Sequence, residues 1–346
     1  MRGGPQVSEE HGADLAYDTP FLPKSAETPL MVMAGFFHLR RCRDKGGVAD
    51  VAVFPANCAV LEATLAHQEE HPGQHDQFSF NTAIAGLGNA FNYSLLDPLR
   101  FANGALFFGA RAPQMLGVRA AVVQNNHMTG TANKEHRFRE HLLWFLESPA
   151  YFRAPEERFL QYDARAPAPA GIVHEASALR NALALARLLN RTLLLPLFCL
   201  YHPHPGVYAG SADWCTAEEY FQMGGAAQSA PVKEHSFLLN PQTPPELLAE
   251  AEAAPRLFIN PFQSDESVHG APDADRLPPE FAFVPADPSA GATPNEIRRW
   301  FGEESVLGKS RVLSFASLHG TRVQVRPKAP LQDAQSLIHS GFDYSS

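Results

Sequence analysis

The chain has 346 residues, of which 45% are hydrophobic and 19% charged, so it holds enough apolar material for a packed core. Its 28 Lys and Arg residues against 37 Asp and Glu residues give a formal net charge of −9. This acidity argues against nucleic acid and anionic membrane surfaces as partners, because both require a basic face. No run of about 18 apolar residues occurs, so the sequence predicts no membrane-spanning segment.

The four cysteines are too far apart for a structural zinc site, because none forms a Cys-x-x-Cys pair. An even number of cysteines permits disulfides without requiring them. Cys199 and Cys215 lie in one loop-rich stretch, and we predict that any disulfide of the second half joins these two.

In the first half, short apolar runs predict strands, with breaks at glycine and polar residues. Residues 30–33 and 36–39 are expected as two strands separated at Gly35, and residues 118–123 as a third. Residues 134–146 then carry apolar side chains at helical spacing, which predicts a helix.

Residues 164–171 read Ala-Arg-Ala-Pro-Ala-Pro-Ala-Gly and divide the sequence. Alternating Pro and Ala resist helix and sheet, so this segment is predicted to be a linker. We therefore expect a first domain over residues 1–163, a second over residues 172–326, and a tail over residues 327–346.

The second half opens with a predicted strand–helix–strand unit. Ile172 and Val173 are a short strand candidate, residues 176–189 have a helical apolar stripe that Asn190 can close, and residues 192–195 are a buried strand. Such units build parallel sheets with helical faces, which predicts the α/β class. The unit has no Gly-x-Gly-x-x-Gly turn, so a standard dinucleotide site is not expected.

The first candidate site is the polar pair Asp76 and Gln77, which precedes Phe78, Ser79, Phe80 and Asn81. If Phe78 and Phe80 both anchor into the core, the polar pair stands at a surface or at the edge of a cleft. The structural alternative is a helix N-cap, for which Asp76 is well suited.

The second candidate site follows the apolar run that ends at Val123. It consists of Gln124, Asn125, Asn126, Gly130, Lys134 and Arg137. Ligands of α/β folds gather at the carboxyl ends of strands, where amides can read hydroxyls and cations can bind phosphate. A nucleotide sugar offers both groups. The alternative is a polar turn followed by a solvated helix face.

The same segments carry a family resemblance. In chain order they are Ala13-Asp14-Leu15-Ala16-Tyr17-Asp18, Ala34-Gly35-Phe36-Phe37-His38-Leu39-Arg40, Asp76-Gln77-x-x-Phe80-Asn81, Phe101-Ala102-Asn103-Gly104, Gln124-Asn125-Asn126-His127-Met128-x-Gly130, Lys233-Glu234-His235-Ser236-Phe237 and Arg311-Val312-Leu313-Ser314-Phe315. This order resembles the nucleotide-diphospho-sugar transferase family of plants and algae. The second half is similar to its extensin arabinosyltransferase branch.

The resemblance implies a partial GT-A glycosyltransferase domain followed by a second α/β region. It implies a Golgi-lumen enzyme that moves L-arabinose from a UDP-sugar donor to glycans of cell-wall glycoproteins. Mn²⁺ held by an Asp-x-Asp motif is the expected cofactor, but that motif is missing: the chain is expected to begin just after it, and with it the membrane anchor is absent. No targeting segment is recognised at Met1–Pro5.

The resemblance also implies roles for the candidate residues. Asp76 matches an acidic residue near the acceptor, as catalytic base or acceptor contact, and Gln77 shares that site. Asn125 and Asn126 would contact the donor, and Lys134 and Arg137 would offset phosphate charge. The family often has His at the position of Gln124.

Two other functions remain open. The segment that ends in Asn190-Arg191-Thr192-Leu193 is also similar to a helix of protein O-fucosyltransferases, which use GDP-fucose without a metal ion. A non-catalytic carbohydrate-binding protein that lacks the metal motif is the second alternative.

Overall fold

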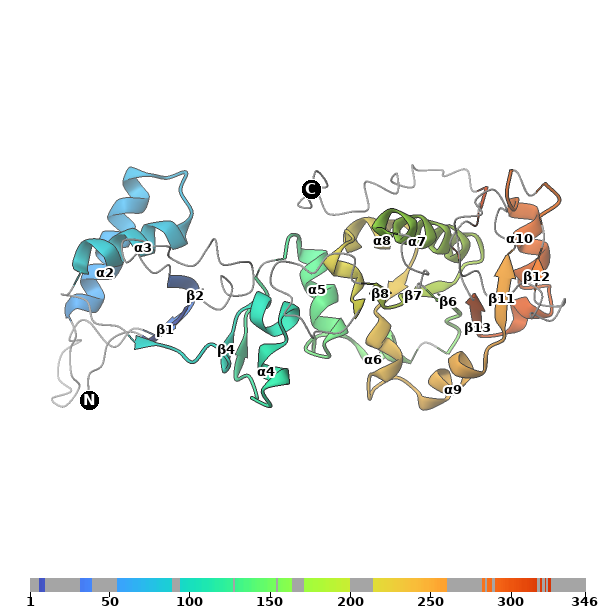
Figure 1. Ribbon diagram of the computed structural model, residues 1–346, viewed down its shortest axis with the longest axis horizontal. Helices are drawn as coiled ribbons and strands as arrows, with labels where there is room; N and C mark the ends of the chain where they lie inside the picture. Colours follow the sequence, from blue (N-terminus) through green and yellow to red (C-terminus); the bar gives the residue numbers. More distant parts are fainter. Residues whose placement is uncertain are drawn as a thin grey trace. The chain divides into compact units, whose positions relative to one another are not determined.

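The computed structural model describes residues 6–9, 32–38, 55–88, 94–126, 128–153, 155–163, 171–199, 214–259, 282–283, 285–287, 290–315, 318, 321 and 323–324. The chain forms two compact units (Figure 1), and each is described by itself. Unit 1 comprises residues 1–127 with 202–211, and unit 2 comprises residues 128–201 with 212–346.

Unit 1 contains a three-stranded sheet and a helical hairpin. Strand β1 (Gln6–Glu9) lies between β2 (Val32–His38), to which it is antiparallel, and β3 (Ser94–Leu95), to which it is parallel. The two strands expected on either side of Gly35 are therefore one continuous strand, β2. Helices α2 (Pro55–Glu70) and α3 (Asp76–Leu87) pack against each other.

A second, two-stranded sheet in unit 1 consists of parallel strands β4 (Phe101–Ala102) and β5 (Val122–Val123). Between them lie a π-helical turn, η3 (Ala105–Gly109), and α4 (Ala112–Met115). The strand expected over residues 118–123 is thus confined to its last two residues.

Helix α5 (Thr131–Glu140) belongs to unit 2 and ends six residues earlier than predicted. It stops because Leu142 adopts a left-handed backbone conformation with φ of 56°. The apolar residues beyond this turn do not join a core: the exposed fraction of Phe145 is 82%.

The centre of unit 2 is a six-stranded sheet in which every pairing is parallel, with strand order β10-β7-β6-β13-β11-β12. The strands are β6 (Phe159–Tyr162), β7 (Thr192–Leu194), β10 (Val232–Lys233), β11 (Arg256–Ile259), β12 (Ala282–Phe283) and β13 (Val312–Phe315). From β6 the chain proceeds outward through β7 to β10, and the later strands lie on the other side of β6. The direction of winding therefore reverses between β6 and β13.

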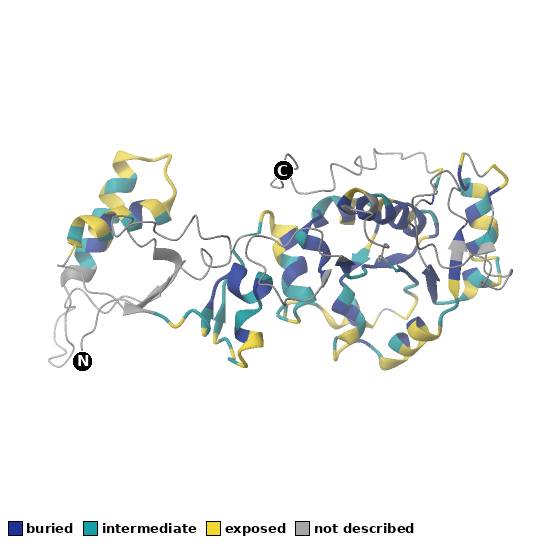
Figure 2. Ribbon diagram, in the orientation of Figure 1, coloured by how far each residue is buried: buried dark blue, intermediate teal, exposed yellow. Residues whose placement is uncertain are grey.

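Helices cover both faces of this sheet (Figure 2). Because side chains alternate along a strand, Leu160 and Leu313 pack with α7 (Gly171–Leu188) and α10 (Pro294–Phe301) in one buried cluster. Phe159 and Val312 face the other way and pack with α9 (Pro245–Ala253) and the 3₁₀ turn η5 (His235–Leu239) in a second cluster. This three-layer arrangement confirms the predicted α/β class.

Smaller elements complete unit 2. They are α6 (Pro149–Phe152), β8 (Phe198–Cys199), β9 (Trp214–Cys215), η4 (Ala217–Glu219), α8 (Met223–Ser229) and η8 (Leu307–Lys309). Cys215 is a buried thiol that forms no disulfide, so the predicted pairing with Cys199 is wrong. Strands β8 and β9 pair with Cys199 opposite Trp214, which offsets the two cysteines by one residue.

The expected domain boundary differs from this division. Strands β6 and β7 are neighbours in one sheet although the Pro/Ala segment lies between them in the sequence. Ile172 and Val173 belong to α7 and not to a strand. Residues 164–170 and 327–346 lie outside the described ranges.

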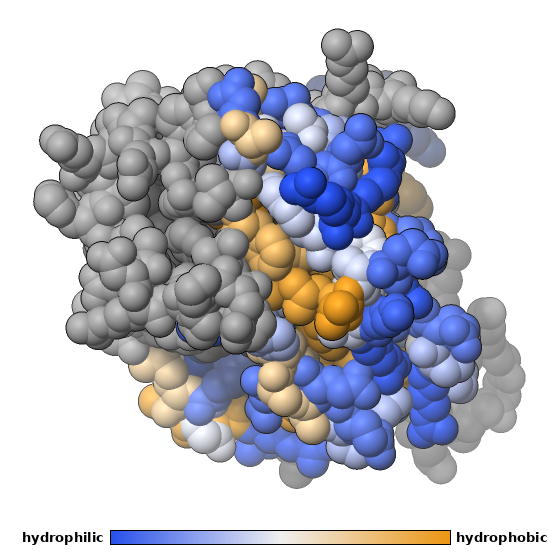
Figure 3. All heavy atoms as spheres, turned by 90° about the vertical axis from the view of Figure 1, so that its right-hand side faces the viewer, coloured by the Kyte–Doolittle hydropathy of each residue, from blue (hydrophilic) through white to orange (hydrophobic). Residues whose placement is uncertain are grey.

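The outer face of unit 2 at the α10 end is largely hydrophilic around one strip of apolar side chains (Figure 3). None of the helices in the described ranges combines the length and the hydropathy that crossing a bilayer requires.

Candidate functional site

The carboxyl ends of β4 and β5 meet at a close backbone approach between Gly104 and Asn126. The Gly104 amide donates to Asn126 Oδ1 at 2.6 Å. A Cβ atom on residue 104 would lie only 2.2 Å from the Asn126 carbonyl oxygen, so this contact requires glycine. This contact fixes Asn126, the last residue of the predicted Gln124–Asn126 run, beside the end of β4.

Asn103, which the sequence analysis did not single out as a site residue, lies at the same edge. Its Oδ1 accepts a hydrogen bond from the Leu106 amide at 2.9 Å and so starts η3. Its Nδ2 is buried and has no hydrogen-bond partner among the described atoms, and the residue is 3% exposed. A buried amide donor without a partner costs free energy, which a ligand oxygen would recover.

The rest of this edge is also rich in amides. Gln124, Asn125 and Asn126 are half-buried, and the Gln124 backbone amide donates to the Ala102 carbonyl at 2.9 Å. Four amide side chains therefore follow two parallel strands at one edge, as the sequence predicted for three of them. The signal for the fourth was the Asn103-Gly104 pair directly after an apolar dipeptide.

Asp76 and Gln77 begin helix α3. The Asp76 side chain is 79% exposed, accepts from the Gln77 amide at 2.7 Å and lies 2.8 Å from His75 Nδ1. His75, not Asp76, is the N-cap. The alternative that Asp76 caps the helix is therefore wrong, because Asp76 is the first residue of α3 and the cap is the residue before it.

The expectation that Phe78 and Phe80 both anchor is wrong, because the segment is a helix and alternate residues of a helix face different directions. Phe80 is buried, whereas Phe78 is 49% exposed. Asp76 still presents a carboxylate to solvent, on a different element from the β4–β5 edge.

Gly130, Lys134 and Arg137 belong to α5 and its start, in unit 2. Gly130 has φ of 82°, a conformation that favours glycine, and it is the N-cap of α5. Lys134 is exposed. Arg137 is 3% exposed and donates to Glu219 Oε1 at 3.0 Å, so its guanidinium joins α5 to η4.

The face of α5 toward η4 carries further buried polar contacts. Asn133 donates to the carbonyls of Glu218 and Phe221 at 3.1 and 2.8 Å and accepts from the Met223 amide at 3.0 Å. His136 Nε2 lies 3.6 Å from Glu218 Oε2. Burial lowers the pKa of His136 to about 3 and raises the pKa of Glu218 to about 7. These contacts are structural.

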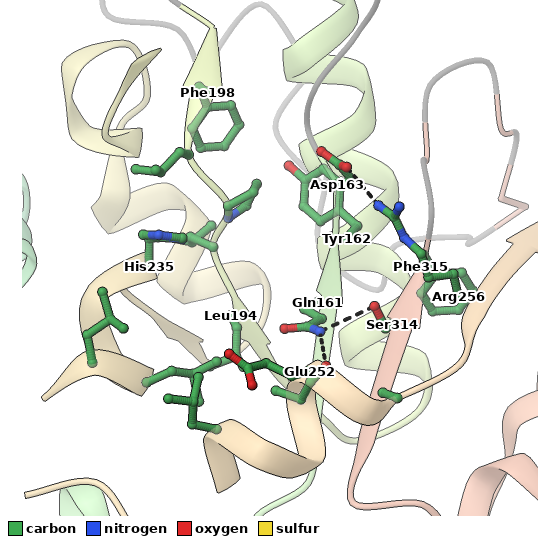
Figure 4. Close-up of a pocket in the computed structure, with 18 residues that line it drawn as sticks. Gln161, Tyr162, Asp163, Leu194, Phe198, His235, Glu252, Arg256, Ser314 and Phe315 are labelled. Carbon is green, nitrogen blue, oxygen red and sulfur yellow. Dashed lines mark hydrogen bonds and ion pairs between the residues drawn. The ribbon is translucent and has the colours of Figure 1, made fainter. Parts of the chain in front are cut away.

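Unit 2 also contains a cleft of about 810 Å³ at the carboxyl ends of β6, β7 and β13 (Figure 4). It lies where the winding direction reverses between β6 and β13, the place where open α/β sheets bind ligands. Its residues come from five separate segments between positions 161 and 315, so no local sequence pattern predicts it.

The polar groups of the cleft converge from several elements. Arg256 Nη2 donates to Asp163 Oδ2 at 2.7 Å, and His235 lies across the cleft from this pair, with Gln161 and Glu252 between them (Figure 4). Gln161 Nε2 donates to the Ala251 carbonyl and to Ser314 Oγ, at 2.9 and 3.2 Å. Burial lowers the pKa of His235, and a backbone hydrogen bond with Leu195 raises it by a smaller amount.

No three His, Cys, Asp or Glu side chains within the described ranges are placed to hold a metal ion. In the cleft, Asp163 faces a guanidinium and not a second carboxylate. The described residues therefore do not fit the Mn²⁺ site that the resemblance implied.

Comparison with known proteins adds a sequence relation. No family model matches the chain. Over 178 residues the chain is 28% identical to arabinosyltransferase XEG113 of Arabidopsis thaliana, which covers 42% of this chain and 28% of the relative. The chain is thus related to a plant glycosyltransferase. It spans less than a third of that protein's length.

Two solved structures of POFUT1 in complex with GDP-fucose also match, in two crystal forms. Their TM-scores are 0.32 and 0.31, at 17% and 16% identity. The matches cover 53% and 52% of this chain and 51% of POFUT1 in both cases.

Proposed function

We propose that the chain is a glycosyltransferase, or part of one, that transfers L-arabinose from a UDP-sugar to a glycan of a cell-wall glycoprotein. The observation that carries this proposal is the amide-lined edge of β4 and β5, with the buried Nδ2 of Asn103 lacking a partner among the described atoms. The relation to an arabinosyltransferase supports it.

The described residues suit this chemistry in distinct ways. The amides of Asn103 and Gln124–Asn126 can donate to and accept from sugar hydroxyls. In the transfer, an acceptor hydroxyl attacks the anomeric carbon, the bond from that carbon to the nucleotide oxygen breaks, and the hydroxyl proton leaves. The exposed carboxylate of Asp76 is the group that we propose to take this proton.

The two cationic candidates, Lys134 and Arg137, differ in their exposure to solvent. Lys134 is exposed on α5 of unit 2, and its role in offsetting phosphate charge stays a prediction from the resemblance. Arg137 is assigned instead to the α5–η4 contact, because it is buried against Glu219. A GT-A fold, a UDP donor and Mn²⁺ remain predictions from the resemblance, and we assign no step of the transfer to the ion because the described residues do not fit its site.

The proposed compartment is the Golgi lumen. Cys58 is disulfide-bonded, which is typical of proteins in an oxidising compartment.

A donor panel with matched variants tests the proposal. The chain is incubated with UDP-L-arabinose or GDP-fucose, with and without Mn²⁺, and a hydroxyproline-linked arabinoside, and the products are read by mass spectrometry. We expect pentose transfer from the UDP-sugar, lowered about tenfold or more in Asn103→Ala, because a sugar hydroxyl loses its amide donor. Gln242→Ala, an exposed amide in a turn, is the control.

Two outcomes would contradict the proposal. Fucose transfer from GDP-fucose without metal would identify an O-fucosyltransferase. Undiminished pentose transfer in Asn103→Ala, with Asp76→Asn equally active, would remove both residues from the mechanism.

A further inference from the structure

The cleft of unit 2 is formed by elements that take no part in the β4–β5 edge, and the roles proposed above leave it unused. The charged side chains among its lining residues are Asp163, Glu252 and Arg256. Two carboxylates against one guanidinium give the cleft a net negative charge, and the lowered pKa of His235 keeps that ring neutral near pH 7.

A nucleotide diphosphate does not suit this electrostatic setting. The guanidinium of Arg256 is already paired with Asp163 at 2.7 Å, so a phosphate would have to compete with a carboxylate. The last turn of α9 also lines the cleft, through Ala251 and Glu252. The carboxyl end of a helix carries negative partial charge, which repels anions.

The same groups suit an uncharged ligand with many hydroxyls. The carboxylates of Asp163 and Glu252 accept hydrogen bonds from hydroxyl groups, and the Gln161 amide oxygen is a further acceptor. Apolar walls supply the remaining contact, as they do in most small-molecule sites. They come from residues 194–198, at the end of β7 and just after it, and from Leu238, Leu239, Leu248 and Phe315. The C–H faces of sugar rings are the natural complement of such walls.

We infer that this cleft is a binding site for a neutral oligosaccharide, separate from the β4–β5 edge. Its volume of about 810 Å³ exceeds the need of one monosaccharide and suits a short chain of sugars. The identification of that oligosaccharide with the glycan acceptor rests on the proposed function. The binding of a neutral sugar at the cleft does not.

Methyl NMR of the full chain tests the inference directly, because leucine side chains line the cleft. Arabinotriose and cellotriose are the neutral probes, and UDP and inorganic pyrophosphate are the anionic ones. We expect at least one trisaccharide to shift the Leu238, Leu239 and Leu248 methyl signals, with an affinity that does not change with salt concentration.

Variants locate the contact. Glu252→Gln removes a charged acceptor and is expected to weaken trisaccharide binding about tenfold. Glu250→Gln, an exposed carboxylate of the same helix that does not line the cleft, should leave binding unchanged. Arg256→Ala tests the anionic alternative, because it would abolish the binding of UDP or pyrophosphate.

Two results would overturn the inference. One is the absence of methyl shifts with both trisaccharides. The other is UDP or pyrophosphate binding that shifts these methyls, weakens with salt and is lost in Arg256→Ala. Neither depends on sugar transfer, so a chain that transfers no pentose but binds a trisaccharide in the cleft would contradict the proposed function alone.

Discussion

His136 and Glu218 form a buried acid–imidazole pair between α5 and η4, 3.6 Å apart. Both are almost wholly excluded from solvent, at 4% and 0% exposure. Burial lowers the pKa of His136 from 6.5 to about 3 and raises that of Glu218 from 4.5 to about 7. Between pH 4.5 and 6.5 the pair therefore binds one proton in the folded chain and one in the unfolded chain, so its two effects on stability cancel.

Removing either partner should reveal how the other residue alone makes the unfolding free energy depend on pH. In Glu218→Gln, the lowered pKa of His136 means that stability is full above pH 6.5 and falls as the pH decreases. In His136→Phe, the raised pKa of Glu218 means that stability is full below pH 4.5 and falls as the pH increases. We expect changes of about 2 kcal/mol across this window, opposite in sign.

Urea unfolding at pH 4.5, 5.5 and 6.5 measures both slopes, each variant being compared with the wild type at the same pH. This comparison is needed because burial also raises the pKa of Glu140 and Glu234. Two variants whose unfolding free energies follow the wild type at all three pH values would show that the pair does not titrate in this way.

At the scale of elements, Arg191 joins the amino ends of three neighbouring strands. Its guanidinium donates to the carbonyls of Phe159 and Arg311, both at 3.1 Å, beside β6 and β13. It also donates to the carbonyls of Gly308 and Ser310, at 2.8 and 2.9 Å, at the end of η8. The residue itself directly precedes β7, so one planar group satisfies four backbone acceptors at this edge.

We expect Arg191→Lys to destabilise the chain by roughly 2–4 kcal/mol. A lysine ammonium keeps the charge but cannot reproduce the planar set of donors that the guanidinium has, so buried carbonyls lose their donors. Denaturant unfolding measures the change. Arg187→Lys, at an exposed position of α7, is the control and should lie within about 0.5 kcal/mol of the wild type. Equal stability of the two variants would contradict this role of Arg191.

The elements that the sequence predicted well are those with local causes. The helical stripe over residues 176–189 and its closure at Asn190, which has φ of 50°, correspond to α7 and its end. Ile172 and Val173 were assigned to a strand because an apolar pair fits either element. The neighbour of β7 is β6, which lies before the Pro/Ala segment, and no local signal reports that pairing.

The candidate residues that the sequence predicted are likewise those with local causes, and the ones it missed depend on contacts between distant residues. The amides after β5 were found because they follow an apolar strand directly. The burial of Arg137 was not predicted, because its partner Glu219 lies 82 residues away in the sequence. The cleft of unit 2 is equally non-local, because the fold alone brings Asp163 and Arg256 together.

At the scale of the whole molecule, the Pro/Ala segment separates two parts of one sheet. Strand β6 pairs with β7 on one side and with β13 on the other, so residues before the segment supply a central strand of unit 2. Phe159 and Leu160 of this strand are almost completely buried, at 1% and 0% exposure. A fragment that ends at residue 163 would therefore expose apolar surface, and so would the fragment left behind.

Cleavage within residues 164–170 tests this arrangement. The segment is replaced by a protease recognition sequence of the same length, the folded chain is cleaved, and the products are analysed by size-exclusion chromatography. Because β6 is held by backbone hydrogen bonds and buried side chains on both edges, we expect the two fragments to elute together, and to separate only in denaturant. Separation in native buffer would instead support a domain boundary at the Pro/Ala segment.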